Sequence, residues 1–129
     1  MEERAMLQLR VVTWNEGTGA CEAAAEHGHL DVIKFAHENG CPWDELTCEA
    51  AAEQGHLDVL KYLHENGCPW NEMTCECAAA FGHLDVLKYA RENGCPWIIE
   101  DCWRAAERRY IETGEDQDTA DWINAQRRS

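Results

Sequence analysis

Cysteine and histidine recur at regular intervals along this chain, and both side chains can bind metals, form cross-links or act as nucleophiles. The sequence of 129 residues contains eight cysteines and six histidines. Six of the cysteines form pairs that are seven positions apart, namely Cys41 with Cys48, Cys68 with Cys75 and Cys95 with Cys102. This spacing raises three alternatives: a metal site, a disulfide within each pair, or packing of reduced thiols.

The spacing argues against metal ligation. Structural zinc sites use two close pairs of ligands, and the only close pair of cysteines is Cys75 and Cys77. A His-x3-Cys-x6-Cys set starts at His37 and again at His64, but Arg91 replaces the histidine in the third copy. We therefore predict neither a metal nor a cofactor, and we keep a metal- or redox-dependent Cys/His module as the alternative.

Reduced cysteines that pack like small apolar residues are favoured over disulfides. The N-terminus MEERAMLQLR lacks the apolar core of a secretion signal, which predicts an intracellular, cytoplasmic protein, with the nucleus also open. Disulfides are rare in that environment. The chain also lacks Ser-His-Asp, G-x-S-x-G, H-E-x-x-H, P-loop and dinucleotide-binding patterns, so we predict no catalytic residue and no enzyme.

The elements that must position these residues come from an internal repeat. The segment GHLDV occurs at Gly28, Gly55 and Gly82, which gives a period of 27 residues. Consecutive periods share 19 and then 17 identical positions. Self-similarity at this period is typical of an array in which each unit packs only against its neighbours.

Each unit reads as two short helices, and we name the first of them helix A. In the second unit, Asp44 is a good N-cap for a helix A of sequence ELTCEAAAEQ, which should end at Gly55. Trp43 and Cys48 flank this cap at the spacing of a hydrophobic staple. The pattern therefore predicts both ends of helix A.

Helix B of the second unit is the segment LDVLKYLHEN. Leu57, Leu60 and Leu63 fall on one stripe of this helix, and Gly67 should end it. His56 and its equivalents lie in the turn between helices A and B, where an imidazole can hydrogen-bond exposed backbone groups. Both helices are too short to be stable alone, so the units must stack.

The ends of the array differ from its middle, as expected for caps. For residues 1–14 we predict either the remnant of a helix B or a short strand. Arg109 replaces the turn glycine, so the last helix A should continue to Gly114 and precede a final helix near TADWINAQRR. We predict one domain over residues 1–129, with an N-terminal cap and first helix A (1–27), three periods (28–54, 55–81 and 82–108) and a C-terminal cap (109–129).

The second unit resembles the helical part of an ankyrin repeat. Its segment TCEAAAEQGHLDVLKYLHENG follows the family pattern PLHLAAxxGHLxVVKLLLxxG at Ala51, Ala52, Gly55, His56, Leu57, Val59, Leu60 and Gly67. Ankyrin units have about 33 residues, so CPWDEL here replaces a longer β-hairpin loop. The resemblance covers residues 18–108 and implies an all-α solenoid of stacked helix-turn-helix repeats with reduced or absent β-hairpin loops.

The resemblance also implies a non-catalytic scaffold for protein–protein interaction, in which the two variable residues of AAxxG face the binding groove. These residues are Glu26, His27, Glu53, Gln54, Ala80, Phe81, Glu107 and Arg108. The repeats support this choice independently, because helix A diverges most while GHLDV and ENGCPW barely change. We therefore expect another protein as the partner, and a monomer as the favoured oligomeric state.

The charge distribution predicts the chemistry of that partner. With 25 acidic and 11 basic residues the net charge is −14, which leaves no basic face for nucleic acid, and no apolar run is long enough for a membrane. Glutamates are spaced to form stripes along each helix A: Glu22 and Glu26, then Glu45, Glu49 and Glu53, then Glu72 and Glu76. Stacking would align them into an acidic ridge suited to a basic protein segment, although solvated faces carry similar charges.

Apolar residues interrupt this ridge in the last unit. Ile98, Ile99 and Trp103 occupy positions that are polar in the preceding unit, which indicates a contact site for an apolar anchor. Packing of Trp103 against the C-terminal cap through Trp122 is the alternative. A consensus-like repeat fragment without a partner of its own is also compatible with such regular repeats.

Overall fold

The structure is a computed structural model that describes residues 20–128, and this part of the chain contains eight α-helices and no strand. The helices are α2 (Ala20–Glu26), α3 (Leu30–Glu38), α4 (Glu45–Gln54), α5 (Leu57–Glu65), α6 (Glu72–Ala80), α7 (Leu84–Glu92), α8 (Ile99–Thr113) and α9 (Gln117–Arg127). The prediction of an all-α fold is confirmed. The cap predicted over residues 1–14 lies outside the described residues.

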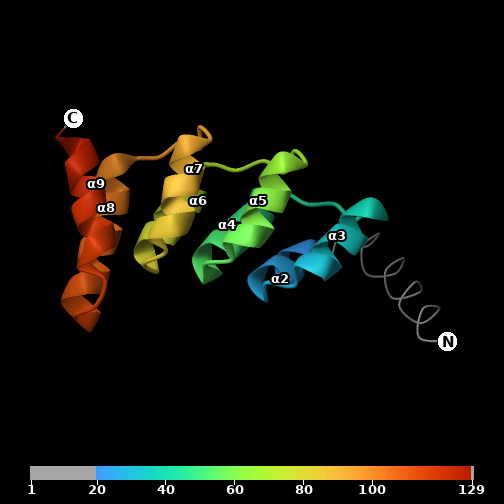
Figure 1. The fold of residues 1–129 in the computed structure, drawn as a ribbon, viewed down its shortest axis with the longest axis horizontal. Coiled ribbons are helices and arrows are strands. Elements are labelled where there is room, and N and C mark those ends of the chain that lie inside the picture. Colours follow the sequence, from blue (N-terminus) through green and yellow to red (C-terminus); the bar gives the residue numbers. More distant parts are fainter. Residues whose placement is uncertain (1–19, 129) are drawn as a thin grey trace.

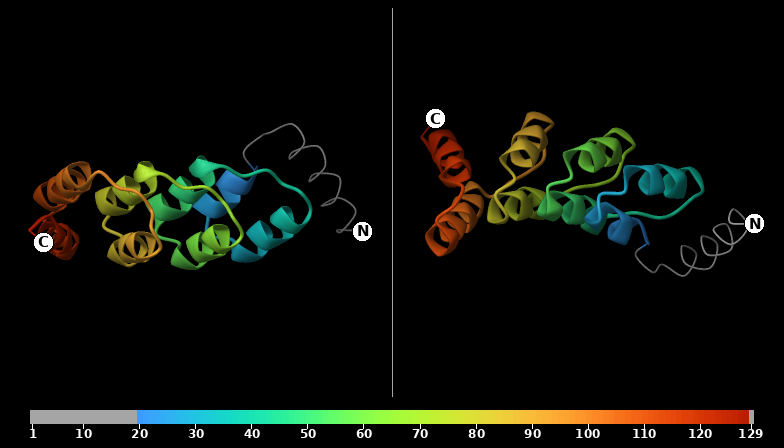
Figure 2. Two further views of the ribbon diagram at one scale, coloured as in Figure 1. Left: turned by 90° about the horizontal axis from the view of Figure 1, so that it is seen from above. Right: turned by 60° about the horizontal axis from the view of Figure 1, so that its bottom comes forward.

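The helices form two rows (Figure 1). The A helices α2, α4, α6 and α8 pack side by side in one row, as Figure 2 shows from above. The B helices α3, α5 and α7 form the second row, each on the A helix of its own repeat, and α9 packs on α8 at the end of the array. This arrangement is the predicted solenoid of stacked helix-turn-helix units.

The local signals for helix ends behave as predicted. The Asp44 side chain accepts a hydrogen bond from the Leu46 backbone N–H at 3.0 Å, which caps α4. Gly55 ends this helix with φ of 76°, and Gly114 ends the extended α8 with φ of 72°. Helix α9 begins at Gln117, two residues before the predicted TADWINAQRR segment.

Small side chains fill the space between the A helices. Cys48 and Ala51 of α4 are completely buried, and their equivalents in α6 are too. The B helices contribute the larger residues, but the predicted stripe is partly wrong: Leu57 is half-buried, whereas Val59 is completely buried. Helix α5 therefore turns a slightly different face to the core than the leucine spacing suggested.

Two histidines from A–B turns join their repeats to the preceding ones. Nε2 of His56 lies 3.0 Å from the Glu26 carbonyl oxygen, and His83 makes the same contact with Glu53. The predicted bond to exposed backbone is confirmed, but its acceptor belongs to the neighbouring repeat. A Cβ atom at Gly55 would lie only 2.6 Å from the His83 ring, so this turn needs glycine both for its positive φ and for the close approach.

We expect Gly55→Ala to destabilise the protein more than Gly67→Ala. Both glycines have a positive φ, but only the Cβ at position 55 would meet a neighbouring ring, whereas nothing lies within 4 Å of one at position 67. The difference in the free energy of unfolding should be about 1–3 kcal/mol, measured by urea denaturation. Adding His83→Ala should remove much of this difference, and equal losses for the two glycine variants would contradict the steric role of His83.

Candidate partner-binding face

The cysteines come together in pairs that the spacing of seven did not predict. Sγ of Cys21 lies 2.6 Å from Sγ of Cys41. The thiols of Cys48 and Cys68, and likewise of Cys75 and Cys95, interact in the same way. Each contact joins a helix-A cysteine to the loop cysteine that follows helix B of the same repeat. The pairs are therefore twenty positions apart, and the interpretation that grouped them seven apart is wrong.

Burial lowers the reactivity of these thiols. Burial raises the pKa of Cys77 and of Cys102 to about 12, because it penalises the thiolate. In Cys68 and Cys75 the pKa is raised first by the hydrogen bond to the paired thiol and then by burial. The thiolate is the reactive and metal-binding form, so this environment favours a structural role for the cysteines.

The histidines of helix B have a packing role as well. The imidazole of His37 stacks on the Trp43 indole with 3.9 Å between ring centroids, and His64 repeats this contact with Trp70 at 4.0 Å. In the third copy Arg91 lies over Trp97 at 4.6 Å, so a planar guanidinium takes the place of the imidazole. This shared stack explains why arginine replaces histidine there. Among the described residues, no group of three His, Cys, Asp or Glu side chains could hold a metal ion.

The A-helix row brings acidic side chains from different repeats together. A hollow of about 100 Å³ between α2 and α4 is lined by Glu22, Glu26, Leu46, Glu49, Ala50 and Glu53. Leu46 is 49% exposed beside these carboxylates. Glu49 also reaches the next helix of the row, because Sγ of Cys77 lies 3.8 Å from its Oε1 and donates to it. The spacing of glutamates at i and i+4 thus produces a shared hollow.

Electrostatics at this hollow favour the arrival of positive charge. Burial raises the pKa of the Glu49 carboxyl group, while the thiol of Cys77 lowers it and the charges of Glu53 and Glu22 raise it further. These raising effects disfavour the ionised carboxylate, and a nearby cation would oppose them. The hollow is therefore an acidic site without a paired base among its lining residues.

The predicted partner-binding residues divide into two groups by exposure. The exposed ones are Glu26, His27, Glu45, Gln54, Glu72, Phe81 and Arg108. The half-buried ones are Glu49, Glu53, Glu76, Ala80, Ile99, Trp103 and Glu107. The structure brings the glutamates of α2 and α4 to one hollow, whereas Trp103, Glu107 and Arg108 line another hollow on α8.

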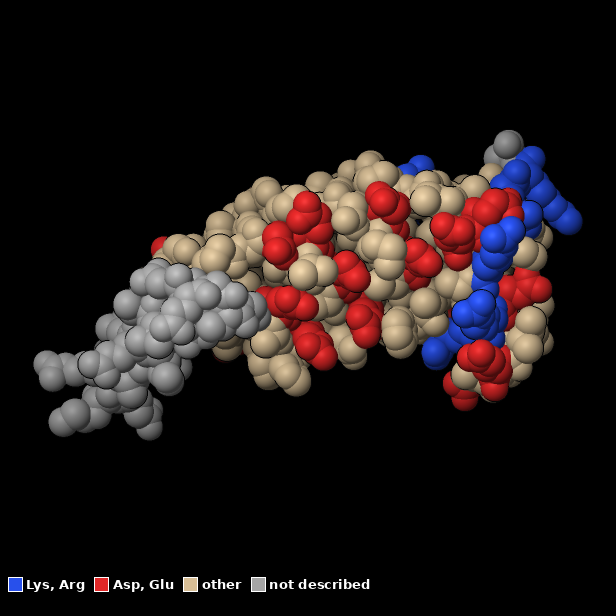
Figure 3. Space-filling model, turned by 180° about the vertical axis from the view of Figure 1, so that it is seen from behind, with Lys and Arg blue, Asp and Glu red and all other residues tan. Residues whose placement is uncertain are grey.

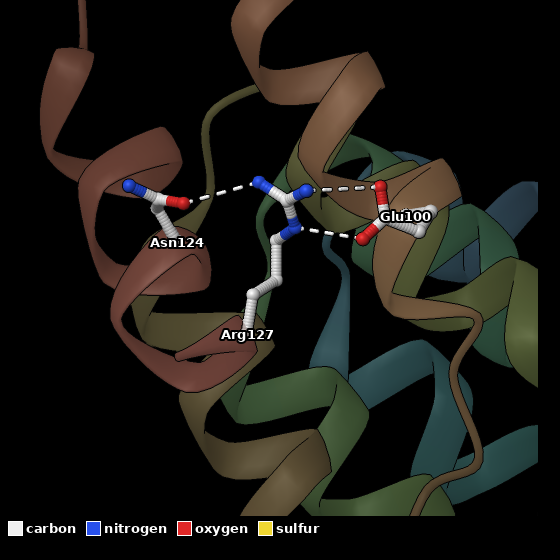
Figure 4. A network of polar contacts seen from close by, with 3 residues as sticks. All are labelled: Glu100, Asn124 and Arg127. Atoms are coloured by element: carbon white, nitrogen blue, oxygen red, sulfur yellow. Dashed lines mark hydrogen bonds and ion pairs between the residues drawn. The ribbon is translucent and has the colours of Figure 1, made fainter. Parts of the chain in front are cut away.

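Trp103 contacts the C-terminal helix, but not through the predicted residue. The Arg127 guanidinium lies over the Trp103 ring at 4.3 Å from its centroid. Figure 4 shows how this guanidinium is fixed: Nε lies 2.7 Å from Glu100 Oε1, and Nη1 donates to Asn124 Oδ1 at 3.1 Å. Trp122 packs instead near Trp97, with 6.0 Å between ring centroids. Trp103 therefore packs on the C-terminal helix through Arg127 and not, as the sequence suggested, through Trp122.

The charge on the A-helix face becomes mixed at its C-terminal end. Figure 3 shows Asp and Glu side chains spread over this face and a column of Lys and Arg side chains at its C-terminal end. Arg104 and Arg108 are both exposed on α8. Sequence reasoning missed Arg104, although the signal was present: it is equivalent to Ala50 and Cys77 in the preceding repeats. The acidic surface therefore belongs to α2, α4 and α6, and α8 differs from them.

Comparison with known families supports the resemblance seen in the repeats. Residues 48–91 match the family model described as ankyrin repeats (many copies). No curated protein matches the chain. Together with the stacked helical repeats, this match supports the similarity of the chain to ankyrin-repeat proteins. Ankyrin repeats generally mediate protein–protein interaction and are not catalytic.

Within residues 20–128, each helix is too short or too polar to cross a membrane. The intracellular location and the division into caps and three periods stay predictions.

We expect the buried cysteines to react slowly with iodoacetamide at pH 8 in the folded protein, since little thiolate is present. Cys77, which is only half-buried, should react first, and all eight cysteines should react quickly in denaturant. Peptide mapping by mass spectrometry measures the rate at each site. Labelling of Cys48 or Cys75 in the folded protein as fast as in denaturant would contradict this.

Stability should fall as the pH rises above about 9. The pKa of Cys102 is raised from 9.0 to about 12 in the folded protein, so its thiol ionises first in the unfolded chain. The stabilisation is complete below pH 9 and is lost as the pH approaches 12, by up to about 1.4 kcal/mol per pH unit for this thiol. Urea denaturation between pH 8 and 11 measures the slope, which Cys102→Ala should reduce. An unchanged slope in that variant would contradict the assignment.

Proposed function

We propose that the A-helix face formed by α2, α4 and α6 binds a basic segment of a protein partner. The observation that carries this proposal is the hollow between α2 and α4, where carboxylates from two repeats surround an exposed leucine. A lysine or arginine side chain suits such a site, because its apolar stem can lie on Leu46 while its charge meets the carboxylates.

Repetition extends this site along the array. Met73 of α6 is equivalent to Leu46 and is 38% exposed. Glu76 is equivalent to Glu49, so the next groove offers a similar combination of acid and apolar surface. Ala80 replaces the next glutamate, which makes the second groove less acidic than the first. A partner segment with its basic residues concentrated over α2 and α4 fits this gradient.

The face ends where the arginines of α8 begin. Arg104 and Arg108 would repel a basic segment, so the proposed contact surface excludes the α8 residues Trp103, Glu107 and Arg108 that the sequence had included. This change in charge also gives the partner a direction, with its most basic end towards α2.

We expect the double variant Glu49→Lys with Glu53→Lys to lose binding to a lysine- and arginine-rich peptide by about tenfold or more, because attraction becomes repulsion at two positions. Fluorescence anisotropy with the labelled peptide measures the affinity. Binding to the original chain should also weaken as salt is added, since exposed charges are screened.

The matched control is Glu38→Lys with Glu65→Lys, which changes the net charge equally at exposed positions of the B helices α3 and α5. This control should bind the peptide nearly as well as the original chain. An equal loss in both double variants would reduce the effect to net charge and overturn the proposed face. Circular dichroism confirms that each variant is folded.

A further inference from the structure

Three helix pairs of the array, α2 with α3, α4 with α5 and α6 with α7, each hold two thiols in contact. Sγ of Cys21 lies 2.6 Å from Sγ of Cys41, and both cysteines are free. The sulfurs of a disulfide are about 2.05 Å apart, so only a small movement separates this pair from the bonded state. The equivalent hydrogen-bonded pairs are Cys48 with Cys68 and Cys75 with Cys95.

The two cysteines of a pair lie at opposite ends of one helix pair. Cys48 is the fourth residue of α4, and Cys68 lies in the loop that follows α5. The backbone N–H of Cys68 donates to the Leu63 carbonyl at 2.9 Å, and its thiol donates to the Asp44 carbonyl at 3.4 Å. These bonds hold the loop thiol against the start of α4. A disulfide here would close one repeat into a covalent ring and would leave the neighbouring repeats unlinked.

Cysteine stands at both positions of each pair, although packing alone does not require it. Ala51 and Ala52 of α4 are completely buried, so alanine also fits inside the A-helix row. A small apolar side chain would fill either cysteine position, whereas a cross-link needs cysteine at both positions at once. The repetition of whole pairs therefore favours bond formation over packing as the reason for these residues.

The short contact fits a disulfide better than a shared metal ion. Zinc binds thiolate sulfur at about 2.3 Å, and two sulfurs on one tetrahedral ion are much further apart than the 2.6 Å between Cys21 and Cys41. Metal binding would push the pair apart, whereas oxidation draws it together. Bond formation is thus the reaction for which the pair is already placed.

We propose that these three pairs are reversible disulfide sites, each of which closes one repeat when the chain meets a small-molecule disulfide. One cysteine of a pair attacks the small disulfide, which forms a mixed disulfide and releases one small thiol. The second cysteine attacks the protein sulfur of this mixed disulfide and releases the other small thiol. Two cysteine thiols are thereby oxidised, one small disulfide is reduced, and the two thiol protons end on the released thiols.

The loop cysteine is the entry point for this reaction. Cys68 is 3% exposed and Cys48 is completely buried, and the neighbours of Cys68 in the loop, Gly67 and Pro69, are exposed. Opening of this loop uncovers the thiol without unfolding α4 or α5. Because burial keeps the thiolate scarce while the loop is closed, exchange is slow in the native protein and becomes faster in dilute urea. In a reducing environment the pairs stay thiols.

Equilibration of the full chain with a mixture of oxidised and reduced glutathione in dilute urea tests the proposal. Remaining thiols are alkylated in denaturant, and peptides are mapped by mass spectrometry without a reductant. We expect bonds within the three pairs that are twenty positions apart, and dithiothreitol should restore all eight thiols. Cys77 and Cys102 are internal controls, because neither has a paired thiol, and they should form no bond within the chain.

The oxidised chain should also unfold at a higher temperature than the reduced chain. We expect a rise of about 10 °C or more in the midpoint measured by circular dichroism, since each disulfide restricts the unfolded chain. Cys68→Ala should leave Cys48 free and remove part of this rise while the other two pairs still close. The matched control is Cys102→Ala, which removes a buried cysteine but no bond.

Three results would overturn the proposal. These are eight free thiols after equilibration with excess oxidised glutathione, bonds between cysteines seven positions apart or between two chains, and an oxidised chain that is no more stable than the reduced one. Glutathione adducts that persist on paired cysteines would contradict it as well. The mapping is done on the original chain, so it decides the question even if Cys68→Ala does not fold. The proposed basic-peptide site does not enter these measurements, and the two proposals stand or fall separately.

Discussion

Close approach of successive A helices is the constraint on which the whole structure depends. Helices of seven to ten residues are marginal alone, so the array is stable only if each helix is covered by its neighbours. Alanine and cysteine at the buried positions of α4 and α6 keep the helices close. The same closeness lets a turn histidine reach the carbonyl of the preceding repeat, and this reach is why glycine has to stand at Gly28 and Gly55.

Local signals explain why so much of the fold could be predicted. Asp44 as N-cap, Gly55 as helix end and Gly114 after the extended α8 act through nearby backbone, so their meaning is readable within a few residues. Contacts between side chains that are further apart depend instead on which atoms meet in space. The pairing of Cys21 with Cys41 and the stack of His37 on Trp43 were for that reason not foreseen, although a constant separation of twenty was visible in the cysteines.

For the candidate surfaces too, the sequence pattern predicted which residues are involved, whereas the structure was needed to show which of them lie together. Glutamates at i and i+4 predicted an acidic stripe, and the geometry adds that Glu22 and Glu26 share a hollow with Glu49 and Glu53. What the pattern did not reveal is the end of that surface. Arg104 and Arg108 stand where earlier repeats have small or neutral residues, and only a comparison of equivalent positions reveals that basic side chains enter the face there.

The repeat lets one position serve different purposes along the array. In α4 the side chain of Glu49 is half covered by the next helix and contributes to an acidic hollow. At the equivalent position of α8, which packs against α9, the chain has Trp103, and Arg127 of α9 lies over its ring. Since the frame depends on Gly, His, Cys, Pro and Trp of the constant segments, these substitutions leave stacking unchanged. The array can therefore carry an acidic face on α2, α4 and α6 and a surface of mixed charge with a tryptophan on α8, without altering the units that support both.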